Sequence, residues 1–127
     1  MRSSSPPLCI VIADNRETAD GLHDYLNKSG FATRTSRRLH DAATLCANAS
    51  ALLLFPDEFD EADVLASLRA LRAQNPRLLL LVVTAAPQRV HAAWNPNPLA
   101  PRTVVLTKPT FGWTLLDAIR AHLSRAT

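Results

Sequence analysis

The sequence is poor in the residues that mark cross-linked, membrane-spanning and nucleotide-binding chains. It has two cysteines and three glycines among 127 residues. Cys9 lies in an apolar run and Cys46 on the apolar face of an expected helix, so both are predicted to be small buried hydrophobes in a reducing compartment. Even the most apolar run, residues 78–83, is far too short to span a bilayer. These scarcities favour a cytoplasmic protein without disulfides and without membrane association.

Three further absences exclude function classes. The first expected strand-to-helix turn, residues 14–17, contains no glycine, so a dinucleotide-binding fingerprint is missing. The net charge is +3, but its only basic cluster (Arg34, Arg37 and Arg38) comes without a helix-turn-helix, zinc or RNA-binding pattern. No nucleophile is paired with a base anywhere in the chain. We therefore expect neither an enzyme nor a nucleic-acid-binding domain.

Apolar runs alternate with segments of helical periodicity along the whole chain. The runs predict strands at residues 8–13, 31–35, 51–55, 78–83 and 104–107. The periodic segments predict helices at residues 17–30, 39–48, 64–74, 88–94 and 110–123. The helix at 88–94 is expected to be short or irregular, because three prolines follow it between residues 95 and 101.

This alternation predicts one α/β domain, residues 8–127, preceded by a disordered lead of residues 1–7. Strands that read as near-continuous apolar runs are typical of a parallel sheet covered on both faces. The predicted fold is therefore a doubly wound, five-stranded parallel sheet with helices on both sides and an irregular fourth helix.

Polar residues follow three of the five strands. Asp14 and Asn15 come after the first strand, Thr84 after the fourth, and Lys108 with Pro109 after the fifth. Ligands bind at the carboxyl ends of the strands in such sheets, so these side chains are expected to converge on a site. With the βα rhythm, the set resembles the receiver domain of two-component response regulators.

The resemblance implies the strand order 2-1-3-4-5 and a cis bond before Pro109. In that family an acid pair after the first strand binds magnesium, and an aspartate at the end of the third strand accepts a phosphoryl group. The hydroxyl after the fourth strand (here Thr84) and the lysine after the fifth (here Lys108) contact the phosphoryl oxygens. Partners commonly bind on the fourth helix, fifth strand and fifth helix.

The sequence departs from the family pattern at the acids. Asn15 stands beside Asp14 where a second acid is usual, and residues 53–56 (Leu-Leu-Phe-Pro) occupy the place of the phosphoacceptor. Asp14 alone is expected to bind magnesium weakly or not at all, so no cofactor is predicted. Lys108, without a phosphoryl group, is predicted to pair with Asp14 or to point to water.

Asp57 is the carboxylate nearest to the missing acceptor, and two interpretations are open. The favoured one places it in a solvated acidic loop, residues 57–61, that caps the next helix. The other makes it a displaced phosphoacceptor that approaches Lys108 and Thr84.

The leading functional hypothesis is an atypical receiver that acts as a phosphorylation-independent protein-interaction module of a two-component-type pathway. Its expected interaction face carries Trp94, Val105 (where the family has an aromatic residue) and Trp113, and it offers a route to a homodimer. One alternative is a working receiver that uses Asp57. The other is a flavodoxin-like domain that binds a small molecule over Asp14, Thr84 and Lys108.

Overall fold

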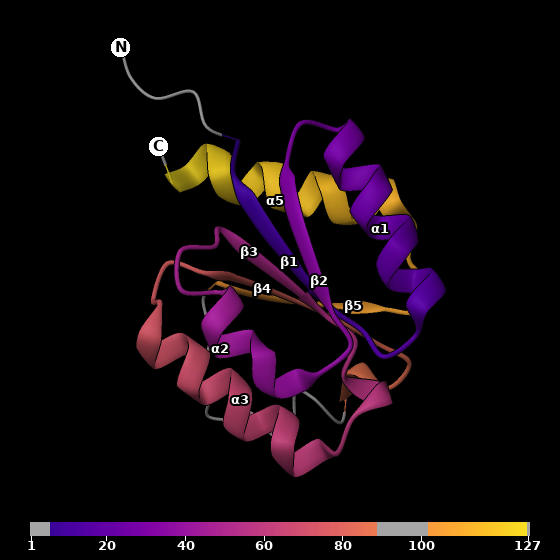
Figure 1. Cartoon of the computed structure of the whole chain (residues 1–127), viewed down its shortest axis with the longest axis vertical. Helices are drawn as coiled ribbons and strands as arrows, with labels where there is room; N and C mark the ends of the chain where they lie inside the picture. The colour runs from indigo at the N-terminus through magenta and orange to yellow at the C-terminus, as the bar shows by residue number, and fades with distance from the viewer. Residues whose placement is uncertain (1–5, 89–101, 127) are drawn as a thin grey trace.

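The chain forms one five-stranded parallel sheet in the order β2-β1-β3-β4-β5 (Figure 1). The structure, a computed structural model, describes residues 6–88 and 102–126. The strands are β1 (Leu8–Ile12), β2 (Ala32–Ser36), β3 (Ala51–Leu54), β4 (Leu79–Thr84) and β5 (Thr103–Thr107). Sheet type and strand order are both as predicted.

Helices cover both faces of this sheet. They are α1 (Arg16–Lys28), α2 (Ala42–Leu45), α3 (Glu61–Gln74) and α5 (Gly112–Ala126), with 3₁₀ turns η1 (Leu39–Asp41) and η2 (Pro56–Glu58). Figure 1 shows α1 and α5 on one side of the sheet and α2 and α3 on the other. The predicted irregular helix and prolines of 88–101 fall, beyond Gln88, outside the described residues.

The three central strands, β1, β3 and β4, are almost wholly apolar because both of their faces are buried, whereas the edge strands β2 and β5 are only partly buried. In β1, Ile10 and Ile12 pack toward α2 and α3, whereas Cys9 and Val11 pack toward α1 and α5. The same alternation runs through β3 and β4, each of which is fully buried. Burial raises the pKa of the Cys9 thiol to about 12, so this free cysteine stays protonated at neutral pH.

Local signals in the sequence set the ends of the long helices. Asn15 caps α1 by accepting a hydrogen bond from the Thr18 N–H at 3.0 Å, and Asp60 caps α3 through the Asp63 N–H. Gly30 follows α1 with a φ of 99°, a left-handed conformation that glycine adopts without strain. The predicted solvated acidic loop thus caps the following helix as expected, but only through Asp60.

The second helical segment is shorter than predicted. Instead of one helix over residues 39–48, the chain forms η1 and a single turn of α2 that ends at Leu45. The end of α3 contacts this segment. There Gln74 donates to the Ala43 carbonyl, and the Asn75 side chain donates to the carbonyls of Cys46 and Ala49. These bonds hold the chain after Leu45 in a turn, where the Ala49 N–H also donates to the Cys46 carbonyl.

The start of the ordered chain differs slightly from the predicted boundary. The carbonyl of Pro7 accepts a hydrogen bond from the Ala32 N–H at 2.9 Å, so the chain is tied to the sheet edge one residue before Leu8. Residues 1–5 of the predicted disordered lead lie outside the described part of the chain.

Candidate functional site

The carboxyl ends of β4 and β5 bring Thr84 and Lys108 together. Thr84 is the last residue of β4 and is 1% exposed. Lys108 follows β5, and its backbone N–H donates to the Thr84 carbonyl at 3.0 Å, which continues the strand ladder by one bond. The Lys108–Pro109 bond is cis, as the resemblance implied. The predicted convergence of these two residues is correct.

The end of β3 presents an aromatic ring at this edge. Phe55 follows β3, and its N–H still bonds to the Ile12 carbonyl. Its side chain is buried in the core between the sheet and helices α1 and α5. The Lys108 ammonium lies 5.9 Å from the centre of the Phe55 ring, within the range of a cation–π contact. The third strand therefore ends in apolar groups, as the sequence predicted.

Asp57 reaches the site from the η2 turn, two residues beyond Phe55. Its Oδ1 accepts a hydrogen bond from the Thr84 hydroxyl at 2.6 Å, and its Oδ2 accepts one from the Ala85 N–H at 2.8 Å. The Lys108 Nζ lies 3.5 Å from the same Oδ2. One expectation is wrong, because Lys108 pairs with Asp57 instead of Asp14. The solvated-loop interpretation of Asp57 is incomplete: its side chain is about one-third exposed, but it also approaches Thr84 and Lys108, as the alternative interpretation required.

The environment of Asp57 favours its ionised form. Partial burial, the largest single influence, raises the pKa of this carboxyl. The hydrogen bonds from Thr84 and Ala85 and the charge of Lys108 together outweigh it, so the net pKa lies below its ordinary value. The side chains of the Asp57–Lys108 pair are about one-third exposed, so solvent weakens their attraction.

Asp14 lies apart from this cluster. Its carboxylate is 3.6 Å from an Arg37 guanidinium nitrogen, and the Arg37 Nε donates to the Asp14 carbonyl at 2.7 Å. The space beside its backbone is taken by Glu58, whose carboxylate accepts hydrogen bonds from the N–H groups of Asp14 and Asn15 at 2.5 and 3.0 Å. The two predicted members of the acid pair thus contribute backbone donors and a helix cap.

The carboxylates at this edge of the sheet already have partners in the protein. In the described residues, no group of three or more histidine, cysteine, aspartate or glutamate side chains is placed to hold a metal. Magnesium needs several oxygen ligands in a near-octahedral arrangement. The oxygens of Asp57 and Glu58 already accept hydrogen bonds from two different loops, and Asp14 faces Arg37.

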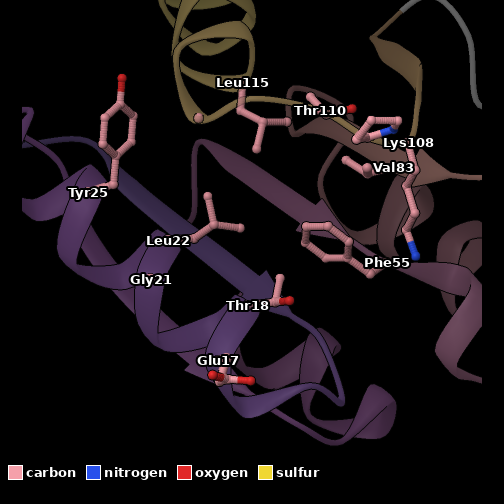
Figure 2. A pocket seen from close by; sticks show the side chains of 12 residues that line it. Glu17, Thr18, Gly21, Leu22, Tyr25, Phe55, Val83, Lys108, Thr110 and Leu115 are labelled. Atoms are coloured by element: carbon pink, nitrogen blue, oxygen red, sulfur yellow. The ribbon is translucent and has the colours of Figure 1, made fainter.

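A cleft of about 530 Å³ opens beside Lys108, between α1 and the start of α5. Figure 2 shows Leu22 and Tyr25 on the α1 side, Leu115 on the α5 side and the Phe55 ring beside the Lys108 side chain. Thr84 and Asp14 do not line this cleft. The small-molecule alternative required a ligand over both of them and Lys108, and of these three residues only Lys108 lines this cleft.

The predicted interaction face is described only in part. Trp113 is 59% exposed and stacks on Phe111, which is 57% exposed, with their ring centres 4.4 Å apart. Val105 is partly buried against the core on the α2 and α3 side. Trp94 lies outside the described residues.

Sequence reasoning missed Glu58, Arg37 and Ala85. Glu58 had a usable signal, because it follows Asp57 in a turn that begins with a proline, and such a turn can send adjacent acids to different neighbours. Arg37 and Ala85 had none, since one acts across the β1–β2 edge and the other through its backbone N–H.

Comparison with known proteins supports the fold. No protein-family model and no curated protein matches the sequence. A response regulator from Thermotoga maritima is 18% identical, with a TM-score of 0.75 over 94% of this chain and 98% of that chain. A receiver domain protein from Methanospirillum hungatei is 15% identical, with a TM-score of 0.79 over 95% and 96%. A receiver protein from Sinorhizobium medicae is 16% identical, with a TM-score of 0.77 over 96% and 98%.

The chain therefore has the fold of response-regulator receiver domains, as the sequence resemblance predicted. No helix in the described segments is long and apolar enough to cross a membrane.

Replacement of Glu58 by alanine should loosen the loop between β1 and α1. The variant loses the acceptor of two backbone N–H groups, so we expect the free energy of unfolding to fall by about 1–2 kcal/mol. The amide resonances of Asp14 and Asn15 should move most. Urea unfolding and amide NMR measure both effects. Asp20→Ala, on the exposed face of α1, is the control. Equal losses of unfolding free energy in the two variants would contradict the stabilising role of the Glu58 carboxylate.

Stability should depend on pH through Asp57. Its pKa is lower in the folded than in the unfolded chain, so the folded form binds fewer protons. The contribution of its charge is complete above the ordinary pKa of 3.8 and is lost as the pH falls below that value toward the folded pKa. We expect the difference in unfolding free energy between the wild type and Asp57→Asn to be constant from neutral pH to mild acid. Below that it should shrink. A difference that stays constant in acid would contradict this account.

Proposed function

We propose that this chain is a phosphorylation-independent, non-enzymatic module that binds a protein partner in a two-component-type pathway of the cytoplasm. The observation that carries the proposal is the occupancy of the site. The donors of Thr84, Ala85 and Lys108 all contact the Asp57 carboxylate, while an aromatic side chain follows β3. We infer that these contacts hold Asp57 in place, and that the end of β3 offers no acid of its own to accept a phosphoryl group.

Electrostatics supports the same conclusion. Phosphoryl transfer depends on positioned cations that neutralise the charge of the transferred group, and magnesium usually supplies most of that charge. We infer that the acids here bind magnesium weakly at best, because their carboxylates already have partners in the protein. Lys108 is then the one cation that directly contacts Asp57 among the described residues.

The competing function is a receiver phosphorylated on Asp57. Its support is the position of this carboxylate beside Thr84 and Lys108. Attack on a phosphodonor would require an oxygen of Asp57 to leave the hydrogen bond it accepts from Thr84 or Ala85. The incoming phosphoryl group would also lack a metal ion held by nearby protein ligands.

The partner surface that we propose is centred on the stacked rings of Phe111 and Trp113. They are the large hydrophobic side chains that stand most exposed in the described part of the chain. Aromatic residues are enriched at the energetic centres of protein interfaces. They begin α5, on the same side of the fold as the predicted interaction face.

Phosphodonor treatment tests the first part of the proposal. We expect incubation with acetyl phosphate and Mg²⁺, or with beryllofluoride and Mg²⁺, to leave the mass and the amide spectrum unchanged. The physical reason is that the donors are engaged and the metal ligands dispersed. Intact-mass spectrometry and NMR are the measurements. A mass increase that Asp57→Asn abolishes would establish the competing function.

Replacement of both exposed rings tests the second part. The double variant Phe111→Ser, Trp113→Ser should keep the fold, because surface substitutions seldom change stability by more than about 0.5 kcal/mol. It should lose partner capture from the native cell, and any self-association seen by light scattering should fall with it. Arg120→Ser, an exposed site on α5, is the matched control. If the double variant captured its partner and associated with itself as well as the wild type does, the partner surface would not include these two rings.

A further inference from the structure

The cleft between α1 and the start of α5 reaches the core on this side of the sheet. Its volume of about 530 Å³ lies in the range of small-molecule pockets. Its most buried lining residues are Phe55, Val83 and Leu115, each at most 7% exposed. Leu22 and Tyr25 line the α1 side and are only partly buried, so apolar surface remains open to an occupant (Figure 2).

Two glycines line the cleft, and packing requires only one of them. A Cβ at Gly112 would lie 3.1 Å from the Tyr25 Cε2 atom, so this glycine lets the ring pack closely against the start of α5. Gly21 has no such neighbour: beyond adjacent residues and its own helix backbone, no described atom lies within 4 Å of its would-be Cβ. Glycine inside a helix costs stability relative to alanine. Gly21 therefore weakens α1 without easing a contact, and it widens the cleft.

The two charged residues that line the cleft are already compensated. The Lys108 ammonium lies 3.5 Å from Asp57 Oδ2. Glu17 stands in the first turn of α1, where the helix dipole favours a negative charge. A charged ligand would lose part of its hydration here without a free counter-charge among the lining residues. The apolar lining and the compensated charges therefore favour an uncharged occupant.

Thr110 adds a directional contact to the lining. Its hydroxyl donates to the Thr107 carbonyl at 2.8 Å, so its proton is engaged and its oxygen can act toward a ligand only as an acceptor. An N–H or O–H group of a ligand can donate to that oxygen. A ring with one such donor therefore matches both the apolar surface and this acceptor.

We propose that this cleft binds an uncharged, mainly apolar ring molecule that carries a hydrogen-bond donor. The ring packs on Phe55 and Leu22, and the donor is directed at the Thr110 hydroxyl oxygen. The site is separate from the sheet edge around Asp57, which does not line the cleft. The inference goes beyond the proposed function, and it holds whether or not Asp57 accepts a phosphoryl group.

Titration with indole tests the proposal, because indole is an uncharged ring with one N–H donor. In amide NMR spectra of the whole chain, the resonances of Gly21 and Gly112 should shift saturably as indole is added. 1-Methylindole lacks the donor and should bind about fivefold more weakly, as expected for the loss of one hydrogen bond. Indole-3-propionate adds a carboxylate and should bind no more tightly than indole.

Variants of the cleft make the titration specific. Gly21→Leu fills the cleft with a good helix former, so indole binding should be lost while the melting temperature stays the same or rises. Asp20→Leu places the same side chain at the neighbouring exposed position, outside the cleft, and should keep indole binding. Thr110→Val should bind indole and 1-methylindole equally. If Gly21→Leu does not fold, Gly21→Ala adds one methyl group at the same place and should weaken indole binding.

Several results would overturn the proposal. Absence of saturable shifts at Gly21 and Gly112, or unchanged indole binding by the folded Gly21 variant, would contradict the assignment of the cleft. Equal affinity of the wild type for indole and 1-methylindole would contradict the donor, and tighter binding of indole-3-propionate would contradict an uncharged ligand. The proposed function is tested separately, by the covalent mass increase and by partner capture, so its failure is distinguishable from these results.

Discussion

The carboxylate of Asp57, held by the Thr84 hydroxyl, the Ala85 N–H and the Lys108 ammonium, is the interaction on which the functional edge of this molecule depends. It gives the buried hydroxyl an acceptor and the ammonium a counter-charge. It also connects the η2 turn to the ends of β4 and β5. Asp14, the acid expected to pair with Lys108, pairs with Arg37 instead.

The apolar end of β3 and the position of Asp57 in the turn after it have one physical cause. Phe55 packs into the core beneath Lys108, so the strand can end without placing a charge at the most buried part of the edge. The acid then arrives from a turn that is closer to solvent, and the donors partly compensate its desolvation. Glu58, the next residue, serves the opposite loop, so one short turn organises both sides of the site.

The sheet could be predicted because its physical cause is local. Strands buried on both faces must be apolar at every position, which makes runs such as 78–83 easy to recognise. Caps such as Asn15 also act over a few residues. The length of the second helix was overestimated, because the turn that follows it is held by Gln74 and Asn75 from the end of α3, and their proximity is a product of the packed fold.

For the candidate site, the sequence alone determined the chemistry that is present and the strand ends that carry it: Thr84 and Lys108 at one edge, and no acid directly after β3. Only the tertiary structure decided which acid meets Lys108. Asp14 was the expected partner, but the neighbouring strand brings Arg37 to it, and the η2 turn directs Asp57 back over the sheet edge. Pairing between charges follows distance in space, and turn geometry together with strand order sets that distance.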